Sequence, residues 1–274
     1  MQGMLQHENY ECEYLIYGVG KRIMFAFHGF GNHASDFKGL EEELGIDYTI
    51  ISVNLFFHGN SSILRRFVEE GFSTEDMKEL MQSLMSRFPA EKYSLIGFSL
   101  GGRIALKLVE LFPDLVDRLY LLAPDGLIVS RFYKYSTFNK TGRKLFNWAK
   151  DQPNTLIRLA GILKKLRLLD DKKYQLAMYH LESKEYRYRV YDVWMVFRRI
   201  RPKLEQIRTT ISEKKISVDL FFGKYDRIIL AEWGAILQKG LEKQVNTTLI
   251  DTGHQLFRSP FLEQIAGKIK NDAE

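Results

Sequence analysis

Ser99 lies in the segment Leu95–Gly102, LIGFSLGG, which has the G-x-S-x-G form that can present a serine as a nucleophile. An apolar run predicts a strand just before Ser99, and an amphipathic stretch predicts a helix just after it. The turn between the two is sharp, so only small residues fit around the serine. The hydroxyl is then lifted off the sheet and faces the positive N-terminal end of the helix. The motif alone is weak, because Gly and Ser are common in turns. Its strand–helix context favours nucleophilic chemistry.

A second glycine-flanked turn, His28-Gly29-Phe30-Gly31, directly follows an apolar run at residues 22–27. Such a turn at the end of a strand frees a backbone N–H. We therefore expect the N–H groups of Phe30 and Leu100 to form an oxyanion hole for a tetrahedral intermediate. His28 is a candidate substrate-binding residue, and a buried, hydrogen-bonded histidine in an ordinary glycine turn is the alternative.

A serine hydroxyl needs a base and a group that orients the base. Asp226 and His254 each follow a predicted strand, and they come in the chain order Ser, Asp, His. Neighbouring strand ends can bring these side chains to Ser99. We predict that His254 accepts the serine proton and that Asp226 holds the imidazole in the required tautomer.

Other residues compete for these roles. Asp125, which follows the predicted strand at residues 118–122, is an alternative to Asp226 as the acidic residue. His180 lies in a helical stretch, where a surface or partly buried histidine is the plainer interpretation. His7 and His33 have no strand end before them.

The elements around these residues alternate between strand and helix. Strands are predicted at 11–17, 22–27, 48–53, 93–96, 118–122, 217–222 and 247–250. Helices are predicted at 74–87, 100–111, 231–241 and 261–269, with Ser73 or Thr74 as the N-cap of the first. This alternation predicts an α/β fold, a mostly parallel twisted sheet flanked by helices.

Residues 125–215 break this alternation, with helical periodicity near 142–150, 155–168, 171–181 and 187–199. They carry 22 Lys and Arg against 9 Asp and Glu, whereas the remainder has 18 against 25. We therefore predict an α/β core from 1–124 and 216–274 and an inserted, basic helical cap at 125–215.

Composition excludes several classes of protein. The 274 residues are 45% hydrophobic and 27% charged with 6 Pro, which is unlike a disordered or collagen-like chain. The single cysteine, Cys12, excludes an internal disulfide and a thiolate-only metal site. No apolar run approaches the ~20 residues of a membrane span. The first 14 residues carry three acidic and no basic residues, unlike a targeting signal. We expect a soluble, cytoplasmic protein.

The strand-HGFG turn, the GFSLGG elbow, the segment Gly223–Asp226 and Gly253-His254, in this order, resemble the α/β-hydrolase superfamily with a helical cap. The resemblance covers about residues 10–124 and 216–270. His58-Gly59-Asn60-Ser61 also matches the H-G-x-S turn of that superfamily, but Asn54–Phe57 replaces the usual D-x-P-G before it. The resemblance implies a pocket between sheet and cap and neither a metal nor an organic cofactor.

A narrower resemblance concerns Ser99–Ala105. This segment is similar to the S-L-G-G-R segment of the menaquinone-pathway enzymes that eliminate pyruvate to form 2-succinyl-6-hydroxy-cyclohexadiene carboxylate. In that family the arginine helps to bind an anionic substrate, so Arg103 is a candidate substrate-binding residue. The same residues occur in many esterases, and the altered Asn54–Phe57 loop differs from that family.

The predicted cap interleaves basic and aromatic residues, notably at 131–135 and 186–201. The plainer interpretation is that the aromatics pack and the Lys and Arg side chains are solvated. The alternatives are an entrance for anionic acyl or CoA-like substrates and contact with an acidic membrane surface. No recognised nucleic-acid-binding motif accompanies the charge, so nucleic acid is not an expected partner. The oligomeric state cannot be read from the sequence.

These observations predict a serine hydrolase that cleaves a carboxylic ester or thioester of a small acyl substrate through an acyl-enzyme. A lyase or C–C hydrolase that uses the same triad on an anionic substrate is one alternative. A non-catalytic ligand-binding module is another, because one fold can serve unrelated functions.

Overall fold

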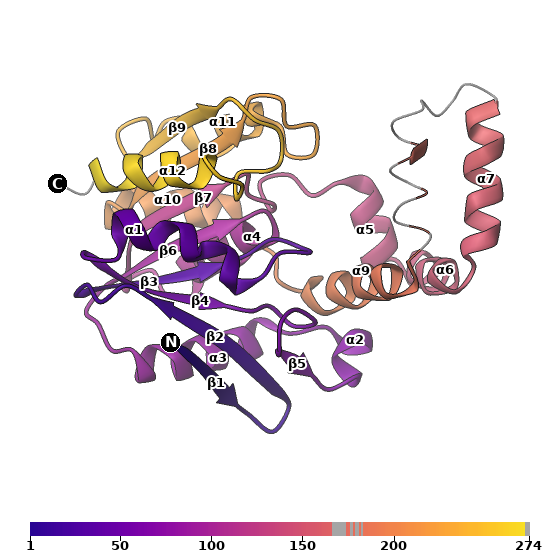
Figure 1. The fold of residues 1–274 in the computed structure, drawn as a ribbon, viewed down its shortest axis with the longest axis horizontal. Helices are drawn as coiled ribbons and strands as arrows, with labels where there is room; N and C mark the ends of the chain where they lie inside the picture. The colour runs from indigo at the N-terminus through magenta and orange to yellow at the C-terminus, as the bar shows by residue number, and fades with distance from the viewer. Residues whose placement is uncertain (166–173, 176–177, 179–180, 182, 272–274) are drawn as a thin grey trace. The chain divides into compact units, whose positions relative to one another are not determined.

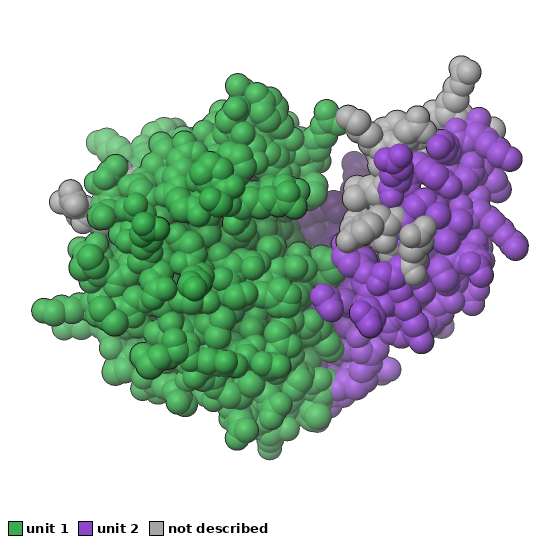
Figure 2. All heavy atoms as spheres, in the orientation of Figure 1, with its two compact units in different colours: residues 1–64, 73–128, 200–274 green, residues 65–72, 129–199 purple. Residues whose placement is uncertain are grey.

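The computed structural model describes residues 1–165, 174–175, 178, 181 and 183–271. These residues form two compact units (Figure 2). Unit 1 consists of residues 1–64, 73–128 and 200–274, and unit 2 consists of residues 65–72 and 129–199. In the described part of the chain, no helix combines the length and the apolar character needed to cross a membrane.

Unit 1 contains one nine-stranded sheet (Figure 1). Its strands are β1 (Gln2–Gln6), β2 (Tyr10–Tyr17), β3 (Arg22–Phe27), β4 (Tyr48–Val53), β5 (Ser62–Ile63), β6 (Tyr93–Phe98), β7 (Val116–Leu122), β8 (Ser217–Gly223) and β9 (Val245–Ile250). The order is β1-β2-β4-β3-β6-β7-β8-β9, with β5 paired to β2. The pairs of β2 with β1, β4 and β5 are antiparallel, and the other pairs are parallel. The predicted mostly parallel α/β sheet is therefore confirmed.

The central strands read as continuous apolar runs because helices cover both faces of the sheet. Every residue of β6 is buried, and Phe25, Ile96 and Leu121 are fully inaccessible. The helical elements of unit 1 are η1 (Ala34–Leu40), α1 (Glu41–Leu44), α3 (Thr74–Arg87), α4 (Leu100–Leu111), α10 (Leu204–Lys214), η2 (Ala231–Trp233), α11 (Gly234–Gln238) and α12 (Phe261–Asn271). Helices α1 and α12 lie side by side on the near face of the sheet in Figure 1, and α10 packs against α4.

The chain reverses its direction of winding between β3 and β6. From β3 it passes to β4 on one side and later returns to β6, which pairs with β3 on the other side. The crevice at such a switch point, outside the carboxyl ends of the strands, is where open α/β sheets commonly bind ligands. The segments that follow β3 and β6 begin with His28 and Ser99, so the sheet order brings the two predicted motifs to this position.

Unit 2 is helical and contains α2 (Arg66–Glu70), α5 (Arg131–Phe138), α6 (Lys140–Asp151), α7 (Pro153–Lys165) and α9 (Lys184–Phe197). Its aromatic side chains pack together. The Trp194 ring lies 5.0 Å from that of Tyr133 and 5.6 Å from that of Phe146, between centroids. Other aromatic side chains of unit 2 are exposed: Phe132 is 66% exposed and Trp148 is 45% exposed.

The segment 65–72 joins unit 2 through contacts with the end of α9. The buried guanidinium of Arg198 donates hydrogen bonds to the carbonyls of Val68, Glu69 and Met195. Helix α10 contacts α4 and lies in unit 1, whereas the sequence placed it within the inserted block. The amphipathic pattern of a helix shows that one face is buried but not which partner buries it.

Candidate active site

Ser99 occupies a strained turn between β6 and α4. Its φ of 50° and ψ of −114° lie outside the backbone conformations that residues other than glycine normally adopt. The neighbouring glycines make the turn sterically feasible. A Cβ atom at Gly97 would lie 2.4 Å from the carbonyl oxygen of Gly101, and one at Gly101 would lie 1.8 Å from that of Phe27. The turn is therefore the sharp strand–helix elbow that the sequence predicted.

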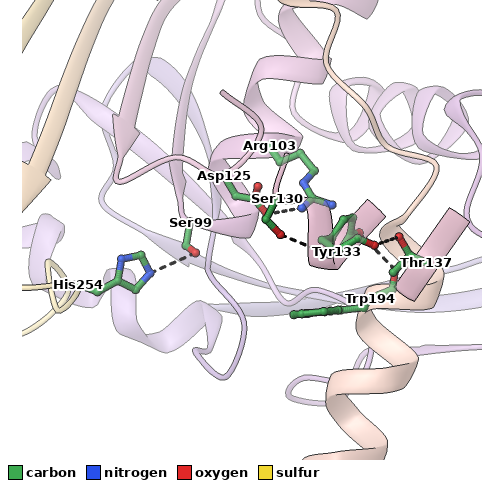
Figure 3. Close-up of polar contacts among 8 residues, drawn as sticks. All are labelled: Ser99, Arg103, Asp125, Ser130, Tyr133, Thr137, Trp194 and His254. Carbon is green, nitrogen blue, oxygen red and sulfur yellow. Dashed lines mark hydrogen bonds and ion pairs between the residues drawn. The ribbon is translucent and has the colours of Figure 1, made fainter. Parts of the chain in front are cut away.

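Ser99, His254 and Asp226 form a hydrogen-bonded relay. The Nε2 atom of His254 lies 3.3 Å from Oγ of Ser99, and its Nδ1 atom lies 2.6 Å from Oδ2 of Asp226. Figure 3 shows the imidazole facing Ser99. A carboxylate only accepts hydrogen bonds, so Nδ1 carries the proton and Nε2 is the acceptor for the serine hydroxyl. This arrangement suits a base that takes a proton from a nucleophile.

The environment of Asp226 keeps it ionised. Its side chain is buried, which by itself would raise the pKa of the carboxyl group. Hydrogen bonds from His254 and from the backbone N–H groups of Ile228 and Ile229, at 2.8 Å and 3.1 Å, outweigh this effect and lower the pKa. The ring of Phe98 covers His254, with centroids 5.1 Å apart.

The two residues predicted to donate to the oxyanion lie on segments next to Ser99. Leu100 is the first residue of α4, so its N–H lacks a helical acceptor and points out of the helix end. A Cβ atom at Gly29 would lie 3.1 Å from Cβ of Ser99, which places the turn that carries Phe30 against the nucleophile. His58 fixes this turn, because its Nε2 atom accepts a hydrogen bond from the N–H of Gly31 at 3.0 Å.

Comparison with known proteins identifies the family. A sequence model of the alpha/beta hydrolase fold matches residues 23–193, more than half of the chain. This chain belongs to the alpha/beta hydrolase fold family.

Curated relatives of this α/β hydrolase match parts of it. It is 31% identical over 118 residues to a Mycobacterium tuberculosis protein without an assigned function, covering 43% of this chain and 33% of that protein. It is 28% identical over 133 residues to a pimeloyl-[acyl-carrier protein] methyl ester esterase of Nitrosomonas europaea, covering 48% and 49%. It is 26% identical over 132 residues to the human monoglyceride lipase, covering 47% and 43%. The match therefore spans a third to a half of the length of these relatives.

Solved structures share the fold over nearly the whole hydrolase chain. The thioesterase domain from the curacin biosynthetic pathway has a TM-score of 0.65 at 14% identity and covers 98% of both chains. The α/β hydrolase MGS-M2, from a deep-sea metagenome library of the Medee basin, has a TM-score of 0.69 at 12% identity and covers 98% of this chain and 96% of its own. At these identities the likeness concerns the fold alone.

Asp125 and Arg103 of this α/β hydrolase pair with each other and are not part of the relay. The guanidinium of Arg103 makes an ion pair with the Asp125 carboxylate (Figure 3), while His254 is bonded to Asp226. Arg103 is only 4% exposed. Asp125 therefore does not act as the acid of the relay, and Arg103 already has a carboxylate partner within unit 1.

His28 supports the turn that begins at its own position. It is fully buried, its Nδ1–H donates to the carbonyl of Gly29 at 2.7 Å, and its Nε2 accepts from the N–H of Leu55 at 3.0 Å. Burial, together with the nearby His58, lowers its pKa to about 3. Since both nitrogens are bonded to the backbone, His28 holds the loops in place and does not offer an atom to substrate. This corrects its sequence-based assignment.

Sequence reasoning missed a buried acidic residue, Glu13, and gave Asn54 and Asn60 no role in the site. Both asparagines lie in the loop that carries His58, and their side-chain amides donate hydrogen bonds to the Glu13 carboxylate. No sequence signal marked Glu13 as buried, because strand alternation places it on the same side as Glu11, which is exposed. His180 lies outside the described residues, as does most of the helix predicted at 171–181. Among the residues that the structure does describe, no group of three or more His, Cys, Asp or Glu side chains is placed to hold a metal ion.

Proposed function

We propose that the protein is a serine hydrolase that cleaves a carboxylic ester or thioester. The observation that carries this proposal is the relay from Ser99 through His254 to Asp226, with Ser99 at a strained elbow. In such a relay the imidazole activates the serine hydroxyl as a nucleophile, and the buried carboxylate orients the imidazole.

In this mechanism, His254 Nε2 takes the Ser99 proton as Oγ attacks the carbonyl carbon of the substrate. The carbonyl electrons move to oxygen, and the resulting oxyanion is stabilised by the N–H groups of Phe30 and Leu100 and by the positive end of α4. Asp226 stabilises the imidazolium that forms. The intermediate collapses to an acyl-enzyme while His254 protonates the leaving group. His254 then takes a proton from water as the water oxygen attacks the acyl carbonyl, and it returns that proton to Ser99 Oγ as the carboxylic acid leaves.

Relatives support a carbonyl substrate with an oxygen or sulfur leaving group. The proteins that resemble this chain include a methyl ester esterase, a monoglyceride lipase and a thioesterase domain. These share attack on an acyl carbonyl, which is the step that the elbow and the two N–H groups serve. We therefore propose acyl transfer to water as the reaction class.

The first test is hydrolysis of p-nitrophenyl esters from acetyl to dodecanoyl. We expect Ser99→Ala to lower kcat by about 10⁴-fold or more, because the nucleophile is removed while the fold is kept. Ser94→Ala is the matched control: Ser94 lies in β6, the strand that leads into Ser99, and its hydroxyl donates to Asp117. A fluorophosphonate probe should label wild-type protein at Ser99 and fail to label Ser99→Ala. Full activity in Ser99→Ala would contradict the mechanism.

The same assays address the other two functions. An enzyme that binds an anionic substrate through Arg103 should lose most of its activity in Arg103→Ala, whereas one for neutral esters should lose little. The ion pair with Asp125 favours the second outcome, because it occupies the guanidinium. If folded wild-type protein hydrolyses none of the esters and the probe labels no serine, the proposed hydrolase is wrong and a binding module becomes the better description.

A further inference from the structure

Glu13 places a carboxylate inside the protein where a strand residue would ordinarily be apolar. It lies in β2, between the buried side chains of Cys12 and Tyr14, and is only 4% exposed. A carboxylate at such a position is strongly destabilising unless hydrogen bonds replace its water. Its partners therefore indicate what it stabilises.

Four N–H groups donate to the Glu13 carboxylate, and all of them are neutral amides. Oε1 accepts from the side chains of Gln2 and Asn60 at 2.6 Å and 2.7 Å. Oε2 accepts from the Asn54 side chain at 2.6 Å and from the backbone N–H of Asn60 at 2.8 Å. Burial alone would raise the pKa of Glu13, but these hydrogen bonds lower it, so the group stays ionised. Three of the four donors belong to the loop of residues 54–61.

This loop is shaped to fit the carboxylate. Gly59 has a φ of 53°, and a Cβ atom there would lie 2.4 Å from Oε2 of Glu13 and 2.2 Å from Nδ2 of Asn54. Ser61 also links the loop to the backbone of Glu13. Its hydroxyl accepts from the Glu13 N–H at 2.9 Å and donates to the backbone carbonyl of Asn54 at 2.8 Å. The backbone therefore packs directly on the acid, and a displaced carboxylate would leave the loop without its support.

The loop in turn holds the segment that carries Phe30. The N–H of Gly31 donates to His58 at 3.0 Å, and the N–H of Ala34 donates to Oδ1 of Asn54 at 2.7 Å. The third bond runs the other way, from the N–H of Leu55 to His28 at 3.0 Å. The Asn54 side chain therefore links Glu13 directly to the segment that carries Phe30. Its NH₂ group donates to Glu13, and its Oδ1 atom accepts from the N–H of Ala34.

We propose that Glu13 is a positioning residue for the oxyanion turn, acting through Asn54 and the 54–61 loop to set where the Phe30 N–H points. The role in catalysis rests on the proposed hydrolase function. The role in ordering residues 28–34 does not, because the hydrogen bonds exist whatever the substrate. Asn54 stands where the family resemblance puts an aspartate, and the carboxylate that the loop packs on comes instead from the neighbouring strand.

A small displacement of an oxyanion donor has a large effect, because the interaction depends on geometry that is set before the reaction begins. Glu13→Gln keeps the size of the side chain but presents an NH₂ group to N–H groups that need an acceptor. We expect it to lower kcat for an ester by about 10- to 100-fold with KM little changed. The affinity for a trifluoromethyl ketone, whose adduct with Ser99 places an oxyanion in the hole, should fall by a similar factor.

The ordering is tested by amide hydrogen exchange, without any substrate. In Glu13→Gln, peptides that cover residues 28–34 and 54–61 should exchange faster than in the wild type, and peptides from β6 and β7 should not. Asp219→Asn is the matched control. Asp219 is a buried carboxylate in β8 that accepts from Asn246 at 3.3 Å, so its loss should speed exchange in β8 and β9 without speeding it in residues 28–34.

Three further variants keep the test decisive if Glu13→Gln does not fold. Asn60 is exposed, so Asn60→Ala removes a single donor to Oε1 and should give a smaller effect on the same peptides. Asn54→Asp alone would set two carboxylates against each other and should be the most harmful. Adding Glu13→Gln to it restores one donor and acceptor pair, so the double variant should recover part of the lost exchange protection and activity.

The outcomes separate the two proposals. Unchanged exchange at residues 28–34 in folded Glu13→Gln and Asn60→Ala would overturn the role of Glu13, even if Ser99-dependent hydrolysis is found. Faster exchange there, with normal kcat and normal ketone affinity, would also overturn its link to the oxyanion. If exchange at residues 28–34 is faster in Glu13→Gln but the wild-type protein hydrolyses no ester, the proposed hydrolase function is wrong and the ordering role of Glu13 stands.

Discussion

The histidines after β3 and β9 illustrate how the surroundings of single residues divide their roles. His254 has one nitrogen on a carboxylate and the other on a hydroxyl, so it can move a proton between substrate and enzyme. His28 has both nitrogens on backbone groups and is fully buried, so protonation would break its bond with the Leu55 N–H. One residue type thus supplies the base and the support for the loop beside it.

This burial predicts an acid-sensitive contribution to stability from His28. Its folded-state pKa is lowered to about 3, against an ordinary 6.5, so the unfolded chain binds a proton that the folded chain refuses. The contribution is complete above pH 6.5 and is lost as pH falls from 6.5 toward 3. Between pH 6.5 and 5 we expect the free energy of unfolding to fall by about 2 kcal/mol from this group. His28→Gln cannot titrate, so urea unfolding at pH 7, 6 and 5 should show the two proteins converging. Parallel curves would contradict the assignment.

At the level of elements, the elbow depends on how closely α4 approaches the end of β3. Gly101 lies in the first turn of α4, against the backbone of Phe27, and a methyl group there would lie 1.8 Å from a carbonyl oxygen that cannot rotate away. Gly267 is also helical, in α12, but a Cβ atom would have no heavy atom within 4 Å. The same chemical change therefore has opposite consequences at two helical glycines of one unit.

We predict that Gly101→Ala lowers the free energy of unfolding by about 3 kcal/mol and removes most hydrolysis, because β3 and α4 must separate. Gly267→Ala should raise it by about 0.5–1 kcal/mol, since alanine favours the helix and restricts the unfolded chain. Urea unfolding of both variants, with ester turnover, checks the pair. A stable, active Gly101→Ala protein would show that the elbow does not pack on β3 as described.

The elements that the sequence predicted are those whose signals are local. The strands at 22–27 and 48–53 have the predicted bounds, because their apolar runs end at turns or polar residues. The helix at 74–87 begins where predicted because Ser73 and Asp76 cap each other. Strand β1 is polar and exists by pairing with β2, so it has no such signal. The roles of Glu13 and of Asp125 depend on partners far along the chain, and only the folded structure shows them.

Across the whole molecule, charge is divided between the two units. By sequence, unit 2 carries 19 Lys and Arg against 8 Asp and Glu, a net charge of +11, whereas the whole chain has +6. Unit 2 also takes residues 65–72 from the middle of the other unit's chain. Helix α2 in this segment has five residues, too few to be stable alone, so it depends on distant contacts. The ion pair between Arg65 and Asp192 is one such contact of the segment, and the hydrogen bonds from Arg198 to the carbonyls of Val68 and Glu69 are others.

Arg198 therefore offers a test of whether unit 2 behaves as one cooperative body. Its buried guanidinium donates to carbonyls of α2, whose C-terminal end also attracts positive charge. In Arg198→Met these carbonyls lose their donors while the volume is roughly kept, and a buried acceptor left unpaired is costly. We expect amide exchange in residues 65–72 and 184–197 to become at least tenfold faster, with β6 and β7 unchanged. The exposed neighbour gives the control, since Arg199→Met should leave exchange in 184–197 near the wild-type rate. If Arg198→Met accelerates exchange in β6 and β7 equally, the two units unfold together, and the division into units has no energetic counterpart.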